Sequence, residues 1–141
     1  MSKITKSAGT PAQNFYAAAR YFFLGAQAIS NGDSELAPAC AFLASQSLEC
    51  VLKSSLSQSG VSEKDLKLKF GHNLEALWVE ASSKGVSVSS QPPVWCEILN
   101  QTHNAPHYLR YPVGINGFQT PEPTSMILEL KRLLDNVLLT I

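Results

Sequence analysis

Residues 34–60 read SELAPACAFLASQSLECVLKSSLSQSG, and the apolar pattern of this stretch predicts the long helix that decides the fold. Ser34 can cap the helix, Pro38 suits its first turn, and Gly60 ends it after about Ser59. The predicted packing face consists of Ala37, Ala41, Ala44, Leu48, Val51, Leu52 and Leu56. Small residues at the N-terminal end of this face allow a second helix to approach closely.

Helical periodicity also appears on both sides of this stretch. Thr10 and Gln13 form a capping box before an apolar run that ends at residues 31–33. Further helices are expected to begin at His72 or Asn73 and after Ser90. A last helix follows Pro123, with a heptad-like seam formed by Ile127, Leu130, Leu134, Val137 and Ile141.

Two segments lack a clear period. Residues 62–70 carry most of the local charge and are expected to form a solvated connector with room for one helical turn. Residues 103–121 are expected to form a long loop, a type of segment that is often functional. With no convincing strand, the sequence predicts an all-α, four- to five-helix up-and-down bundle. A single domain is expected over residues 1–141, with residues 1–10 as a flexible tail.

The charge composition excludes several classes of protein. Lys and Arg number 11, Asp and Glu number 11, and charged residues make up 16% of the chain, below the roughly 25% of an ordinary domain. The shortfall is filled by neutral polar residues, including 17 serines. A hydrophobic content of 45% argues against disorder, and zero net charge argues against a broad DNA-binding surface.

The chain carries no pattern typical of export or membrane insertion. Residues 1–13 lack the apolar segment of a signal peptide, and the longest apolar run, residues 15–29, is too short to span a bilayer. Cys40, Cys50 and Cys96 do not form a disulfide framework and are expected to be buried thiols. We therefore expect a cytoplasmic protein that does not associate with membranes.

The first candidate site lies on the long helix. Gln46, Glu49 and Lys53 share one stripe, and Glu49 precedes Lys53 in the favourable i, i+4 order. These two residues are the only charges between Leu36 and Ser62. They are expected either to line a polar cleft or to form a weak ion pair on a solvated face.

A second candidate is Lys69-Phe70-Gly71-His72-Asn73-Leu74. Gly71 permits a sharp turn, which places His72 at a helix N-terminus, where the helix dipole disfavours its charged form. His72 and Asn73 are therefore expected either to contact a ligand or to cap the helix.

A third candidate lies in residues 103–112. His103 and His107 have a zinc-like spacing, but Pro106 between them breaks the helical geometry, so no metal is expected. Arg110 is flanked by Tyr108 and Tyr111, and could bind a phosphate while a ring stacks on a base, or could instead pair with Glu49. Glycine-rich nucleotide loops, nucleophile elbows and CxxC motifs are absent, so no cofactor is expected.

Taken in order, these motifs resemble the HEPN superfamily. The resemblance spans roughly residues 14–140 and rests on Glu49/Lys53, on residues 69–77 and on Arg110-Tyr111-Pro112. It implies a helical bundle that is often dimeric, in one of two groups. One group comprises metal-independent ribonucleases, and the other comprises non-catalytic proteins that bind nucleotide, RNA or a nucleotidyltransferase partner.

The ribonuclease group carries an Arg followed after four to six residues by a His, and this order is absent here. The favoured interpretation is therefore a non-catalytic, dimeric binding module. Its binding residues would be Gln46, Glu49, Lys53, His72, Asn73, Arg110 and Tyr111. One alternative is a ribonuclease with a rearranged site, in which Arg110 stabilises charge and His103 or His107 transfers protons. The other is a purely structural polar network.

Overall fold

The protein is all-α over the residues that its computed structural model describes, which are 9–105, 107, 117 and 119–141; no strand occurs among them. The α-helices are α1 (Pro11–Ile29), α2 (Ala37–Gln58), α3 (Glu63–Asp65), α4 (Leu74–Ser83), α5 (Val94–His103) and α6 (Pro123–Leu138). A short 3-10 helix, η1 (Ser34–Leu36), precedes α2, and a π-helix, η2 (Leu66–Phe70), follows α3. None of the described helices is long and apolar enough to cross a membrane.

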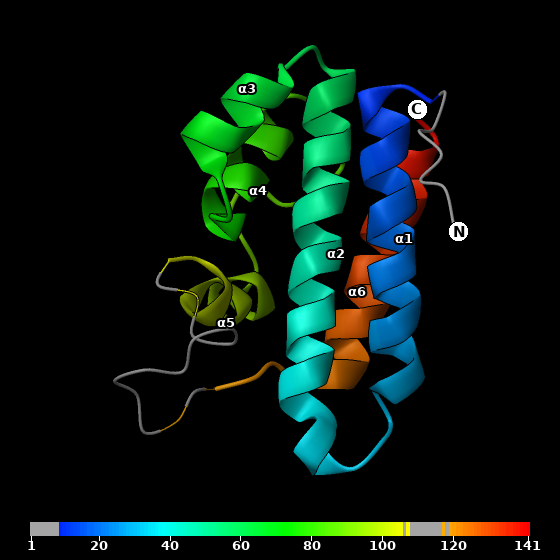
Figure 1. Ribbon diagram of the computed structural model, residues 1–141, viewed down its shortest axis with the longest axis vertical. Helices are drawn as coiled ribbons and strands as arrows, with labels where there is room; N and C mark the ends of the chain where they lie inside the picture. Colours follow the sequence, from blue (N-terminus) through cyan, green and yellow to red (C-terminus); the bar gives the residue numbers. More distant parts are fainter. Residues whose placement is uncertain (1–8, 106, 108–116, 118) are drawn as a thin grey trace, which may run out of the picture.

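Helix α2 is the centre of the molecule (Figure 1). Helix α1 lies antiparallel beside it, and α6 packs against both of these helices. Helices α4 and α5 contact α2 from its other side. Because α2 is covered on two sides, more than half of its residues are buried, including several polar ones.

The hydrophobic core follows the apolar faces that the sequence predicts. Leu48 and Leu52 of α2, Leu77 of α4 and Leu130 of α6 are fully buried in one continuous cluster. Burial of a leucine side chain contributes about 1.5–3 kcal/mol, so these contacts are the main force that holds the helices together.

Two serine hydroxyls join α2 to α1. Oγ of Ser47 donates to the carbonyl of Ala19, and Oγ of Ser54 donates to the carbonyl of Ala12, both at 2.7 Å. Ser47, Ser54, Ala12 and Ala19 are all buried. Because these side chains are small, the two helix backbones approach closely enough for a hydroxyl on one helix to reach a carbonyl of the other.

The helix ends confirm one predicted cap and correct another. The capping box of Thr10 and Gln13 is present at the start of α1. Ser34, in contrast, does not cap α2; it lies inside η1, which the side chain of Asp33 caps. Helix α2 begins at Ala37 without a side-chain cap, and Pro38 occupies its first turn, where a missing N–H costs no hydrogen bond.

The segment predicted to be a solvated connector is more helical than expected. Ser62 caps α3, which continues into the π-helix η2, and Leu66 is buried. The backbone N–H of Gly71 donates to the carbonyl of Leu66 at 3.1 Å and closes the wide turn. Short π-helical turns are rare and frequently occur near functional sites.

Candidate functional site: a glutamate and three histidines

All three histidines of the chain lie around one glutamate. Glu49 and Lys53 come from the middle of α2, His72 from the turn after η2, His103 from the last turn of α5, and His107 from just beyond that helix. We term these five residues the Glu49 cluster. Four separate parts of the fold therefore contribute to one group of ionisable side chains.

The carboxylate of Glu49 organises the cluster. Its Oε1 lies 2.7 Å from Nδ1 of His72 and 2.8 Å from Nε2 of His103. Its Oε2 accepts a hydrogen bond from Nζ of Lys53 at 3.2 Å. Both carboxylate oxygens are thus held in place, and Oε1 contacts two imidazoles at once.

The Glu49–Lys53 pair is buried and does not lie on a solvated face. Glu49 is 7% exposed and Lys53 is 8% exposed. Burial by itself would raise the pKa of the Glu49 carboxyl. The hydrogen bond from His103, the charge of Lys53 and the hydrogen bond from His72 outweigh burial and hold this pKa at about 2. Glu49 is therefore a carboxylate at neutral pH.

The hydrogen bonds also fix where the imidazoles carry their protons. Nδ1 of His107 donates to the backbone carbonyl of His103 at 2.9 Å, because a carbonyl only accepts. Since the Glu49 carboxylate likewise only accepts, Nδ1 of His72 and Nε2 of His103 carry protons. Among the described residues, neither Nε2 of His72 nor Nε2 of His107 has a hydrogen-bond partner.

The three rings are packed against one another. The ring of His72 meets that of His107 edge to face, with centroids 5.1 Å apart, and that of His103 in the same manner at 5.7 Å. His103 is buried, whereas the side chain of His72 is 41% exposed and His107 is half-buried. His107 also has a positive φ of 64°, which is uncommon for a residue with a side chain. The cluster therefore has an interior side and a side that solvent reaches.

A glycine turn directs His72 toward α2. Gly71 has φ 54° and ψ −117°, a combination that is accessible mainly to glycine. The next residue but one, Asn73, caps α4, with its Oδ1 accepting from the N–H of Ala76 at 3.1 Å. The turn places His72 between the π-helix and α4, where its ring reaches Glu49.

Asn100 of α5, which is not among the residues predicted from the sequence, supports this turn. Its Oδ1 accepts from the N–H of Leu74 at 2.7 Å. Its Nδ2 donates to Glu75 at 2.8 Å and to Asn73 at 3.2 Å. Asn100 precedes His103 by three residues, which places both on one face of α5, and this spacing is a signal that could have identified it.

The other sequence candidates have different outcomes. Gln46 is half-buried and makes no hydrogen bond to the described members of the cluster. Arg110 and Tyr111 lie outside the described residues. The expectation of no metal concerned the spacing of His103 and His107. The structure instead brings ligand atoms of Glu49, His72 and His103 within 4.8 Å of one another.

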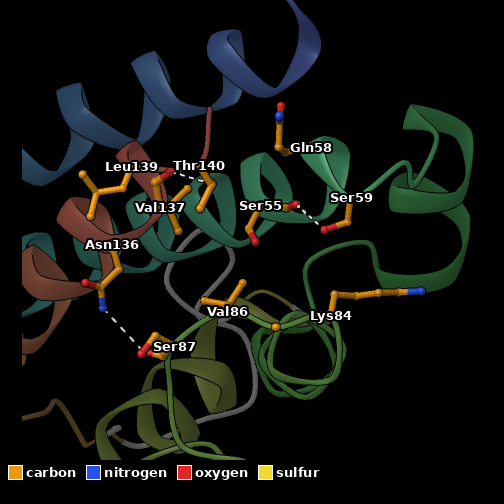
Figure 2. A pocket seen from close by; sticks show the side chains of 11 residues that line it. Ser55, Gln58, Ser59, Lys84, Val86, Ser87, Asn136, Val137, Leu139 and Thr140 are labelled. Carbon is orange, nitrogen blue, oxygen red and sulfur yellow. Dashed lines mark hydrogen bonds between the residues drawn. The ribbon is translucent and has the colours of Figure 1, made fainter.

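A separate cleft of about 400 Å³ lies between the C-terminal ends of α2 and α6 and the loop after α4 (Figure 2). Ser55, Lys84, Val86 and Leu139 are among its lining residues, and none of the Glu49 cluster lines it. The cleft has mixed apolar and hydroxyl walls. It contains no group of ionisable side chains comparable to the cluster.

No family model, curated protein or solved structure matches this chain.

Proposed function

We propose that the protein is a non-catalytic, HEPN-like helical module that binds nucleotide or RNA at the solvent-facing side of the Glu49 cluster. The observation that carries this proposal is that two histidines bind one buried, ionised glutamate while the third, His107, packs against the ring of His72. A purely structural network would not need a half-exposed member, yet the side chain of His72 is 41% exposed.

The chemistry of the exposed rings suits a nucleotide. His72 and His107 each use Nδ1 for an internal hydrogen bond, so Nε2 is left for a ligand. A neutral ring accepts there from a ribose hydroxyl or a base N–H, and a protonated ring donates to a phosphate oxygen. Imidazole faces also stack on nucleobases.

The resemblance to HEPN proteins supports the same proposal. Arg110 and Tyr111 follow His107 closely in sequence and would supply a phosphate contact and a stacking ring. Low charge and zero net charge fit a local contact with a few ligand atoms better than a broad phosphate-tracking surface. The resemblance also implies a homodimer and, as a protein partner, a nucleotidyltransferase.

Titration with AMP, ATP and a short fluorescent RNA in a chelating buffer tests the proposal. The His107→Ala and Arg110→Ala variants are expected to bind at least tenfold more weakly than the wild type. Arg132→Ala, which removes an exposed arginine from α6, is the matched control and is expected to bind normally. Wild-type protein that binds none of the three ligands, or variants that bind as the wild type does, would contradict it.

A metal-independent ribonuclease is the second candidate, and the contact between the His72 and His107 rings favours it. Two neighbouring imidazoles on the solvent-facing side are the kind of pair that general acid–base catalysis uses. Incubation of labelled RNA with highly purified protein in the presence of a chelator tests this candidate. Cleavage that is lost in His72→Ala and His107→Ala would support it, and the absence of cleavage by the wild type would remove it.

A further inference from the structure

The structure assigns a Zn²⁺-binding site to Oε1 of Glu49, Nδ1 of His72 and Nε2 of His103. This inference goes beyond the proposed function, because the cation would bind the protein without any nucleotide. It rests on the positions of three ligand atoms that come from α2, the turn before α4, and α5.

The distances fit a metal site after a small adjustment. The two nitrogens lie 2.7 and 2.8 Å from the same oxygen, and all three atoms lie within 4.8 Å of one another. In a tetrahedral zinc site with bonds near 2.0–2.1 Å, neighbouring ligand atoms are about 3.3 Å apart. Each nitrogen therefore has to move from Oε1 by about half an ångström, and the two nitrogens, which lie at most 4.8 Å apart, have to come to about 3.3 Å from each other. Because both nitrogens point at Oε1, rotation of the Glu49 side chain has to open the space for the ion.

The ligand types are those of an open zinc site. Two histidines and one carboxylate leave a fourth position for water or a ligand oxygen, as in zinc sites that bind or activate small molecules. Glu49 and His103 are buried, so the attraction between cation and carboxylate is weakly screened. The half-exposed His72 provides access for the ion from solvent.

Neighbouring residues hold the ligands in position. Nζ of Lys53 donates a hydrogen bond to Oε2 of Glu49, so the carboxylate would bind the ion through Oε1 alone. Nδ1 of His107 holds the carbonyl of His103, and the His107 ring contacts that of His72. Contacts of this kind orient metal ligands in known sites. The positive charge of Lys53 opposes the cation, so we expect micromolar rather than nanomolar affinity.

Zinc and a proton compete for the same two ring nitrogens. Without the ion, Nδ1 of His72 and Nε2 of His103 each hold a proton that faces Glu49. With the ion bound, the coordinating nitrogen of each ring is deprotonated, and the ring carries its proton on the other nitrogen. Binding therefore changes the tautomer of His72 and of His103 but leaves His107 as it is.

Isothermal titration of chelator-stripped, full-length protein with ZnCl₂ tests the site. The wild type is expected to bind one ion per chain, and His72→Gln and Glu49→Gln are expected to bind at least tenfold more weakly. Glu97→Gln is the matched control, because it removes an exposed carboxylate of α5, the helix that carries His103, and lies outside the Glu49 cluster; it is expected to bind within threefold of the wild type. Circular dichroism confirms that each variant is folded, and His72→Gln, at a half-exposed position, keeps the test valid if Glu49→Gln unfolds.

Nitrogen-15 correlation spectra of the histidine rings provide a second measurement. Added Zn²⁺ is expected to switch the tautomers of His72 and His103 and not that of His107. No binding below millimolar Zn²⁺, equal loss in His72→Gln and Glu97→Gln, or unchanged tautomers would overturn the site. Because nucleotide binding is measured with a chelator present, failure of the zinc site and failure of the proposed function give different results.

Discussion

Nε2 of His103 lies 2.8 Å from Oε1 of Glu49, although 54 positions separate the two residues in the sequence. This contact ties α5 to α2 through a buried ionised group. Removing one member of a buried charged network is costly, because the remaining members stay in the interior without a partner. Loss of Glu49 should therefore destabilise the protein more than loss of a glutamate from a surface ion pair.

Glu49→Gln is expected to lower the free energy of unfolding by about 3 kcal/mol, because it leaves Lys53 buried without its counter-ion. Urea denaturation followed by circular dichroism measures the change. Glu80→Gln is the matched control: Glu80 forms the same i, i+4 pair with Lys84, but on the surface and at 3.8 Å. We expect that control to cost about 0.5 kcal/mol or less. Equal losses in both variants would contradict the burial argument.

Asn100→Leu is expected to destabilise the protein by about 2 kcal/mol, since it leaves the N–H of Leu74 buried without an acceptor. The control is Asn136→Leu, because Asn136 is exposed and makes only a 3.4 Å contact with the carbonyl of Ser87. Thermal and urea unfolding of both variants give the comparison. If Asn100→Leu proves as stable as Asn136→Leu, then Asn100 does not support the start of α4.

Glu122 is expected to make the stability of the protein sensitive to acid. Hydrogen bonds from the Ser125 side chain and backbone and from the Thr124 backbone hold the pKa of the Glu122 carboxyl at about 2, below its usual value of 4.5. A lowered folded-state pKa means that the stabilisation is present above pH 4.5 and is lost as the pH falls toward 2. Because Glu122 is fully exposed, salt should weaken the effect.

Urea midpoints measured between neutral and acidic pH test this prediction. In Glu122→Gln, the midpoint is expected to fall less steeply below pH 4.5 than in the wild type. Glu129→Gln, on the exposed side of the same helix, serves as the control. Identical acid profiles for the wild type and Glu122→Gln would show that this cap contributes nothing to the acid sensitivity.

The cysteines are expected to react slowly in the folded protein. Burial, reinforced by the charges of Glu75 and Glu97, raises the pKa of the Cys96 thiol from its usual 9 to about 12. Burial and the charge of Glu49 raise the pKa of the Cys50 thiol to about 11. Since the thiolate is the nucleophile, alkylation at neutral pH should be at least about 100-fold slower than in urea. Mass spectrometry after iodoacetamide treatment measures the rates, and rapid native labelling of Cys96 would contradict its burial.

The long helices were predictable because their apolar residues repeat at helical spacing. The segment around η2 was not, since charged residues such as Lys67 and Lys69 alternate with apolar ones, and this pattern does not distinguish a connector from a π-helix. Ser34 illustrates a different limit. Serine is a common capping residue, but here a 3-10 turn that includes Ser34 precedes the α-helix, which begins at Ala37 with Pro38 in its first turn.

The site was partly predictable for the same reason. The pairing of Glu49 with Lys53 follows from local spacing. The contacts of Glu49 with His72 and His103 depend on how α4 and α5 pack against α2, and periodicity within one helix carries no information about that packing. Glu49, His72 and His103 could therefore be identified separately from the sequence, but the contact of both histidines with one carboxylate could not be predicted.

The two serine hydroxyls between α1 and α2 fix the position of one helix along the axis of the other. Ala12 and Ala19 are seven residues apart, as are Ser47 and Ser54, so the two contacts repeat after two helical turns in opposite chain directions. A slide of one helix along the other would break both bonds at once. The α1–α2 pair is therefore a fixed support, and α4 and α5 bring His72 and His103 to its α2 side.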